Sequence, residues 1–415
     1  MIVRPFKALR PRKDLVDRVA CPPYDVVTEE EVRSIVSGNP YSFLNIVRAE
    51  ATFEKGVNPY DEKVYRKARK NLERFVEEGI LLREDSPAFY IYRQTMREHQ
   101  QTGIVACVSV DEYLANKIKK HELTRQDKED DRTRHIVNLK ANTGPVFLTY
   151  RACEELDRFV QEILVKDPAP EYDFEDENGV NHTVWVIKKS DLIETITDLF
   201  KEIDCFYIAD GHHRAAAAVR AREHFKSFNP HHRGDEEYNF FMAVIFPHDQ
   251  LQILPYNRVV KDFGGMNEEE FIERVNEKFE LEKAEKDPFE PHEKHLFGMY
   301  TGKWYVLRAK PGIYDPDDPV DSLDVQILQK NLLAPILKIE DPRRDSRIDF
   351  VGGIKGVEYL QKLVDEGKYA LAFSMYPTSV EELMKVADAG MIMPPKSTWF
   401  EPKLRSGLFV HELED

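Results

Sequence analysis

The stretch CFYIADGHHRAAAAVRAREHFK, residues 205–226, decides the fold around it. Cys205–Ala209 is a short apolar run that suits a buried strand, and Asp210-Gly211 is typical of a tight turn. The alanines at 215–218 and the residues after them favour a helix. The pattern therefore predicts a strand, a turn and a helix start in immediate succession.

A helix that starts directly after Gly211 would present an anion-binding site. The first backbone N–H groups of a helix have no partner inside it, and the helix dipole favours negative charge at that end. Gly211 would let the backbone approach a ligand closely, and the guanidinium of Arg214 has the fork geometry that grips phosphate oxygens. We therefore predict that a phosphate-bearing cofactor binds to Gly211, His212, His213 and Arg214.

The polar side chains of this turn are also candidate catalytic residues: Asp210, His212 and His213. The Asp210 carboxylate could accept a hydroxyl proton or ligate Mg²⁺. A plain Asp-Gly turn before a capped helix is the structural alternative, but packing explains two histidines and an arginine at a helix start poorly. A metal site made by His212 and His213 is a sharper alternative. Adjacent side chains rarely point at one ion, and the sequence shows no nearby cluster that completes the ligands.

A second polar stretch, HELTRQDKEDDRTRH at 121–135, places five cationic or imidazole side chains at spacings of 4, 3, 4 and 3. This spacing predicts one face of a helix without an apolar stripe of its own. The face would form a wall that binds an anion. His121 is a catalytic candidate on it, and Arg125, Lys128 and Arg132 are candidate cofactor-binding residues. His135 is the last residue of the face. The alternative is a solvated helix whose cations pair with its own acidic residues.

Single residues at turn and strand ends complete the candidate set. Asp25 follows a rigid Pro-Pro-Tyr turn, which would either present its carboxylate for catalysis or only cap the turn. The candidate substrate-binding residues are Tyr24, Arg48, Arg258 and Arg347.

The bulk composition limits the class of protein. The 415 residues include 59 Lys and Arg against 75 Asp and Glu, a formal net charge of −16. An acidic chain repels nucleic acids and anionic lipids, so a small-molecule substrate is the expected partner, with no nucleic acid and no membrane. The sequence has no apolar run of roughly 20 residues and no apolar signal core, which predicts a cytoplasmic protein. The four cysteines are scattered, so a disulfide framework or cysteine zinc site is not expected.

The remaining pattern alternates helices with antiparallel hairpins and predicts an α/β, mixed α+β, architecture. Hairpins are expected at 88–110, 172–187 and 297–309, and a capping box at Thr28 predicts a helix start. Expected domain boundaries divide the chain into 1–184, 185–260, 261–340 and 341–415. The sequence contains no Walker loop, G-x-S-x-G, H-E-x-x-H or G-x-G-x-x-G motif.

Several long motifs resemble the family catalogued as domain of unknown function 1015, over nearly the whole chain. They are CPPYDVV (21–27), NPYSFLNIVR (39–48), HELTRQDKEDDR (121–132), IADGHHRAAAA (208–218), LPYNR (254–258), DPRRDSRIDFVGG (341–353) and MPPKSTWFEPKLRSGL (393–408). The family name itself implies no reaction.

The order of elements in 184–246 is similar to the nucleotide-binding core of the ParB/sulfiredoxin superfamily. The opening strand at 2–10 resembles that superfamily's first strand, separated here by a large N-terminal insertion, and an α+β C-terminal region follows the core. The resemblance implies binding of a nucleoside di- or triphosphate such as ATP or ADP. Sulfiredoxins, CTP-binding ParB proteins and free-serine kinases share this core.

Departures from these relatives narrow the expectation. His212 stands where sulfiredoxins carry a reactive cysteine, and neither a helix-turn-helix nor a basic region is evident. The Asp-Gly-His-His-Arg form is most similar to the kinase branch. The expected function is a nucleotide-dependent phosphotransferase acting on a small hydroxyl metabolite, possibly free serine, with Mg²⁺. A phosphatase or nucleotidase using the same pocket, and a non-catalytic nucleotide-binding switch, are the alternatives.

Overall fold

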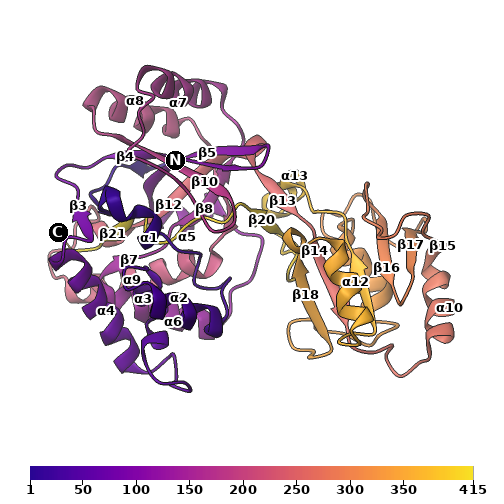
Figure 1. The fold of residues 1–415 in the computed structure, drawn as a ribbon. Helices are drawn as coiled ribbons and strands as arrows, with labels where there is room; N and C mark the ends of the chain where they lie inside the picture. Colours follow the sequence, from indigo (N-terminus) through magenta and orange to yellow (C-terminus); the bar gives the residue numbers. More distant parts are fainter. Residues whose placement is uncertain (415) are drawn as a thin grey trace. The chain divides into compact units, whose positions relative to one another are not determined.

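The computed structural model describes residues 1–414, which form two compact units (Figure 1). Unit 1 comprises Met1–Leu251 and the segment that starts at Pro402, and unit 2 comprises Gln252–Glu401. The sequence predicted four regions. The expected boundary at 184/185 lies inside strand β10 (Val180–Ile187), whose whole length pairs with β4 (Phe89–Met96). A sheet shared across that boundary keeps both sides in one unit.

A mixed sheet is the centre of unit 1. Its main path runs β6 (Ile118–Lys119), β11 (Phe206–Asp210), β8 (Val146–Tyr150), β12 (Phe240–Pro247), β5 (His99–Ser109), β4, β10 and β9 (Tyr172–Glu175), and β1 (Val3–Arg4) pairs with β5. Strand β8 runs parallel to β12 and antiparallel to β11. The predicted hairpins at 88–110 and 172–187 are both present.

The apolar core of this sheet is covered by helices. Side chains of α7 (Glu154–Lys166) and α8 (Ser190–Lys201) join it, and Ala215 and Ala218 of α9 (His212–Phe228) pack into the same cluster. Two other alanines of α9, Ala217 and Ala221, belong to a second apolar cluster, together with Ile136 of α6 (Gln126–Leu139). The alanine run therefore lets α9 lie close to its neighbours on two sides.

A second layer of unit 1 holds the N-terminal helices and a small sheet. The helices are α1 (Val16–Val19), α2 (Glu29–Gly38), α3 (Leu44–Val47) and α4 (Glu62–Glu77), and the sheet order is β3 (Leu81–Arg83), β2 (Ala8–Pro11), β21 (Val410–Glu412) and β7 (Ala141–Asn142). The predicted capping box of Thr28 with Glu31 is confirmed. The expected opening strand is split at Pro5, which cannot donate to a ladder, so β1 and β2 join different sheets.

Unit 2 is built on its own antiparallel sheet. The order is β15 (Phe279–Lys283), β17 (Trp304–Ala309), β16 (Leu296–Tyr300), β19 (Leu371–Ser374), β14 (Tyr256–Val260) and β18 (Ile348–Gly352), and β13 (Gln252–Leu254) pairs with β20 (Trp399–Glu401). Its helices are α10 (Glu268–Lys278), α11 (Asp324–Leu328), α12 (Val357–Asp365) and α13 (Val380–Asp388). The mixed α+β class predicted from the sequence is confirmed in both units. In residues 1–414, no helix has the length and apolar character needed to span a bilayer.

The close packing of α9 yields a stability prediction. Ala217→Leu adds three carbon atoms between α9 and α6, where the alanine is fully buried. Overpacking of this kind should lower the free energy of unfolding by about 1–3 kcal/mol, measured by urea denaturation. The matched control is Ala216→Leu, at a half-buried position of the same helix, which should change stability far less. Equal effects at the two positions would contradict the tight packing described for Ala217.

Candidate functional site

The strand, turn and helix predicted at 205–226 are present as β11, Gly211 and α9. Gly211 has φ +95° and ψ +28°, the left-handed conformation that favours glycine, and it gives the helix no side-chain cap. A Cβ at this position would lie 3.1 Å from Nε of Arg214. The missing side chain therefore leaves room for Arg214 to fold back over the turn.

The Arg214 side chain is fixed by the protein on two sides. Its Nη1 donates to the backbone carbonyl of Pro145, and its Nη2 lies 3.8 Å from a carboxylate oxygen of Asp210. The side chain is 14% exposed. The guanidinium is thereby held beside the helix start, in the place where sequence analysis expected an anion-binding group.

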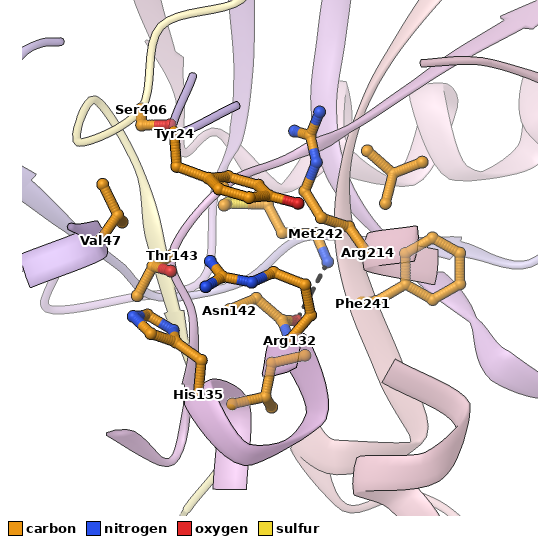
Figure 2. Close-up of a pocket in the computed structure, with 13 residues that line it drawn as sticks. Tyr24, Val47, Arg132, His135, Asn142, Thr143, Arg214, Phe241, Met242 and Ser406 are labelled. Atoms are coloured by element: carbon orange, nitrogen blue, oxygen red, sulfur yellow. Dashed lines mark hydrogen bonds between the residues drawn. The ribbon is translucent and has the colours of Figure 1, made fainter. Parts of the chain in front are cut away.

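Arg214 lines a cavity of about 500 Å³, a volume that includes its open mouth (Figure 2). The wall combines two guanidinium groups with hydroxyl, amide and apolar side chains. The lining residues are Tyr24, Val47, Arg132, His135, Ile136, Asn142, Thr143, Gly144, Val146, Arg214, Phe241, Met242 and Ser406. All of them belong to unit 1.

The second guanidinium of the cavity belongs to Arg132 of α6. Its Cζ lies 4.1 Å from the centroid of the Tyr24 ring, and its Nη2 lies 2.6 Å from a carboxylate oxygen of Asp131. Burial opposes the charge of Arg132, but Tyr24 and Asp131 outweigh it and raise the pKa of Arg132. Burial also raises the pKa of Tyr24 to about 12. The cavity thus pairs a permanent cation with a neutral phenol. Figure 2 shows both side chains in the cavity wall.

Arg48, a predicted substrate-binding residue, holds the turn that carries Tyr24. Its Nη1 donates to the carbonyl oxygens of Tyr24 at 2.8 Å and Val27 at 3.1 Å, and its Nε forms an ion pair with Glu50. Arg48 is not among the residues that line the cavity. Its contacts are those of a positioning residue that acts through Tyr24.

The two histidines of the turn face different neighbours. Nε2 of His213 accepts a hydrogen bond from the backbone N–H of Arg125 at 3.1 Å. Burial lowers the pKa of His213, while nearby Asp25 and Glu129 oppose that shift. Asp25 is exposed, and its effect on the pKa of His213 indicates that its carboxylate lies near the helix start.

His212 instead packs against His121. The two rings meet edge to face with centroids 4.5 Å apart, and both side chains are buried. Burial lowers the pKa of His121 to about 4, although Asp210 and a hydrogen bond with the Ile208 backbone raise it in part. His212 and His213 do not share a ligand position. The sequence alone showed no group of metal-ligating residues beside His212, whereas the structure places His121 and Glu122 there.

Asp210 lies between cationic groups. Nζ of Lys403 is 3.4 Å from one carboxylate oxygen, and Arg214 approaches the other. Burial opposes ionisation of Asp210, but Lys403, Arg214 and His212 outweigh it and lower its pKa to about 2. A carboxylate whose two oxygens already face cations is poorly suited to ligate Mg²⁺, so the expected metal role of Asp210 fits this arrangement poorly.

The predicted cationic face is only partly a face of one helix. His121 precedes α6, and Arg125 is the residue before its first turn. Arg125 pairs with Asp127 at 2.8 Å, and Nζ of Lys128 lies 3.3 Å from the Tyr60 hydroxyl. Neither Arg125 nor Lys128 lines the cavity, whereas Arg132 and His135 do. The helix also buries Ile136 and Leu139, so it does pack against its neighbours.

Arg258 and Arg347, predicted to bind substrate, belong to unit 2. Arg258 is buried and donates to the carbonyl oxygens of Tyr256 and Lys396. Arg347 pairs with Asp345 at 2.7 Å and with Asp262 at 3.3 Å. These contacts hold loops of unit 2 together.

Other polar residues near the helix start were not predicted from the sequence to be site residues. Thr143 and Ser406 line the cavity, Lys403 pairs with Asp210, and Glu122 adjoins His212. Lys403 and Ser406 follow unit 2 in the chain, and only the fold returns them to unit 1. Because these residues lie nearly 200 positions after the Asp-Gly turn, no local sequence pattern predicts that they lie beside it in the fold.

The chain matches one family of proteins in sequence and several solved structures in fold. A family model described as "Protein of unknown function (DUF1015)" matches residues 3–326. No curated protein matches the sequence.

Solved structures with a similar chain path include three that illustrate its range. A free serine kinase in complex with AMP is 14% identical, with a TM-score of 0.35, covering 71% of this chain and 86% of that one. A conserved hypothetical protein from Pyrococcus furiosus is 15% identical (TM-score 0.37; 73% and 93% covered). SbnI from Staphylococcus aureus, with a C-terminal truncation, is 11% identical (TM-score 0.38; 73% and 85% covered). TM-scores this low do not transfer a function.

The buried imidazole of His135 predicts how stability depends on pH. Burial, with a contribution from Arg132, lowers its pKa to about 3 in the folded state. Below the ordinary pKa of about 6.5 the unfolded chain takes up a proton that the folded chain does not. The free energy of unfolding therefore decreases as the pH is lowered, by up to about 1.4 kcal/mol per pH unit. When the pH is lowered from 7 to 5.5, the free energy of unfolding of His135→Gln should therefore decrease by about 1 kcal/mol less than that of wild type. Urea denaturation at the two pH values measures this difference.

The control for this measurement is the exposed His224, on α9. His224→Gln should show the wild-type loss of stability between the two pH values. If His135→Gln and wild type lose the same free energy, His135 does not resist protonation in the folded state as described.

Proposed function

Because the chain belongs to the DUF1015 family of proteins of unknown function, we propose a function from the chemistry of its own cavity. Unit 1 binds a nucleoside di- or triphosphate, ATP or ADP, and transfers its terminal phosphoryl group to a small metabolite that carries a hydroxyl. The observation that supports this most is the pair Arg132 and Arg214 on the wall of one cavity, beside a helix start without a side-chain cap.

The wall of the cavity matches a ligand with an apolar part and an anionic part. Val146, Phe241 and Met242 supply apolar surface, while the two guanidiniums supply charge. A nucleotide has both parts, because its base is flat and largely apolar and its phosphates are anionic. Guanidinium groups bind phosphate oxygens through two parallel hydrogen bonds.

The proposed reaction is an in-line phosphoryl transfer. The acceptor hydroxyl oxygen forms a bond to the terminal phosphorus, the bond from that phosphorus to the bridging oxygen breaks, and the shortened nucleotide leaves. The hydroxyl proton passes to a carboxylate. Asp25 suits this role better than Asp210, because Lys403 and Arg214 disfavour protonation of the Asp210 carboxylate and make it a weak base. Free serine is the acceptor suggested by the resemblance of the Asp-Gly-His-His-Arg turn to free-serine kinases.

Nucleotide binding is tested by thermal shift with ATP, ADP, CTP and GTP in the presence of Mg²⁺. A ligand at a hundred times its Kd stabilises the folded state by about 2.7 kcal/mol. Arg214→Met should weaken binding about ten- to hundredfold, because a charge-assisted hydrogen bond contributes about 1.5–3 kcal/mol. Each variant is compared with its own unliganded form, which separates lost affinity from lost stability.

The matched control is Arg220→Met on the same helix. Arg220 also pairs with carboxylates, at 2.6 Å to Asp130, but it does not line the cavity. Its nucleotide shift should equal that of wild type. A wild type that none of the four nucleotides stabilises, or an Arg214→Met variant with an unchanged shift, would refute the phosphate site.

Catalysis is tested by following phosphoryl transfer from ATP or ADP to serine, other amino acids and sugars. Asp25→Asn should lower kcat by about 10²–10⁴-fold with little change in nucleotide affinity, because a general base acts on the transition state. Asp249→Asn, in the short helical turn His248–Gln250 of unit 1, is the control. Phosphate release without an acceptor would show a hydrolase instead. Binding without turnover would show a non-catalytic switch.

A further inference from the structure

Two buried imidazoles beside the turn each have a nitrogen that no protein group uses. His121 is 3% exposed and His212 is 4% exposed. Nδ1 of His121 and Nε2 of His212 are buried and have no hydrogen-bond partner. A buried polar atom without a hydrogen-bond partner destabilises the folded state. Such a pair, in contact edge to face, indicates that a ligand completes the site.

A carboxylate stands next to both rings. Oε2 of Glu122 lies 3.9 Å from Nδ1 of His212, the ring nitrogen other than the unpartnered Nε2, and one ligand atom from each of His121, Glu122 and His212 lies within 4.8 Å of the others. The ligand atoms of a tetrahedral ion lie roughly 3.3 Å apart when its bonds are about 2 Å long. Small side-chain rotations would therefore bring these three atoms onto one ion.

We infer that His121, Glu122 and His212 bind a divalent transition-metal ion of the Zn²⁺ class. Two imidazoles and a carboxylate suit Zn²⁺, Co²⁺ or Ni²⁺, whereas Mg²⁺ prefers oxygen ligands. His121 hydrogen-bonds to the Ile208 backbone, which orients the ring in the way that outer partners orient metal-binding histidines. The Glu122 side chain is 43% exposed, so water can reach the remaining coordination positions.

The ion would connect two segments that are distant in sequence. His121 and Glu122 precede α6, and His212 is the first residue of α9. The inference does not depend on the proposed nucleotide site, because none of the three ligands lines that cavity. His213, although adjacent to His212, is excluded as a ligand by the hydrogen bond that its Nε2 accepts from Arg125.

The test uses the full chain after treatment with a chelator and extensive dialysis. Zn²⁺ is titrated calorimetrically, and Co²⁺ binding is followed by its visible absorption, which reports the coordination number. We expect one tightly bound ion per chain and no comparable binding of Mg²⁺. Glu122→Gln and His212→Asn should each weaken Zn²⁺ binding by on the order of a hundredfold or more, since even outer-shell partners are worth tenfold to hundredfold.

His224→Asn is the control, because His224 is an exposed histidine of the same helix. It should bind Zn²⁺ as wild type does. Glu122→Gln keeps the test decisive if His212→Asn fails to fold, because Glu122 is partly exposed. Zn²⁺ that binds equally to wild type and Glu122→Gln would be an adventitious ion only and would overturn the inference. Nucleotide shifts measured without Zn²⁺ report separately on the proposed function.

Discussion

The left-handed backbone of Gly211 is the constraint on which the candidate site depends. It turns the chain from β11 into α9 within one residue, and its missing Cβ leaves the space that Arg214 occupies. The same turn sends Asp210 toward Lys403 and His212 toward His121. A side chain at this residue would strain the backbone and displace the guanidinium at once. The cavity and the imidazole pair therefore share one origin.

The elements of the fold that depend on neighbouring residues in the chain could be predicted from the sequence. The Asp-Gly turn between an apolar run and an alanine-rich run predicted β11 and α9, and the Thr28 capping box was found as expected. The mixed α+β class followed from hairpins that alternate with helices. The start of the helix in the stretch 121–135 was predicted too early. The helical spacing of the polar side chains includes His121, but His121 precedes the helix. Its spacing from Arg125 was coincidental.

Contacts between distant segments could not be predicted from a single sequence. Arg48 ends a short helix and looks like any surface arginine, yet it holds the Tyr24 turn through two carbonyl oxygens. Glu122 was regarded as one acid of a charged run, and only the packing of α6 against α9 places it beside His212.

The interrupted course of unit 1 along the chain has a consequence for biosynthesis. A ribosome synthesises residues 252–401 before it makes β21, which pairs with both β2 and β7, and before it makes Ser406 of the cavity wall. The intervening unit, whose sheet draws all its strands from 252–401, has every residue it needs by then. Unit 1 therefore depends, for its small sheet and for one residue of its cavity wall, on a segment that is synthesised after the whole of unit 2.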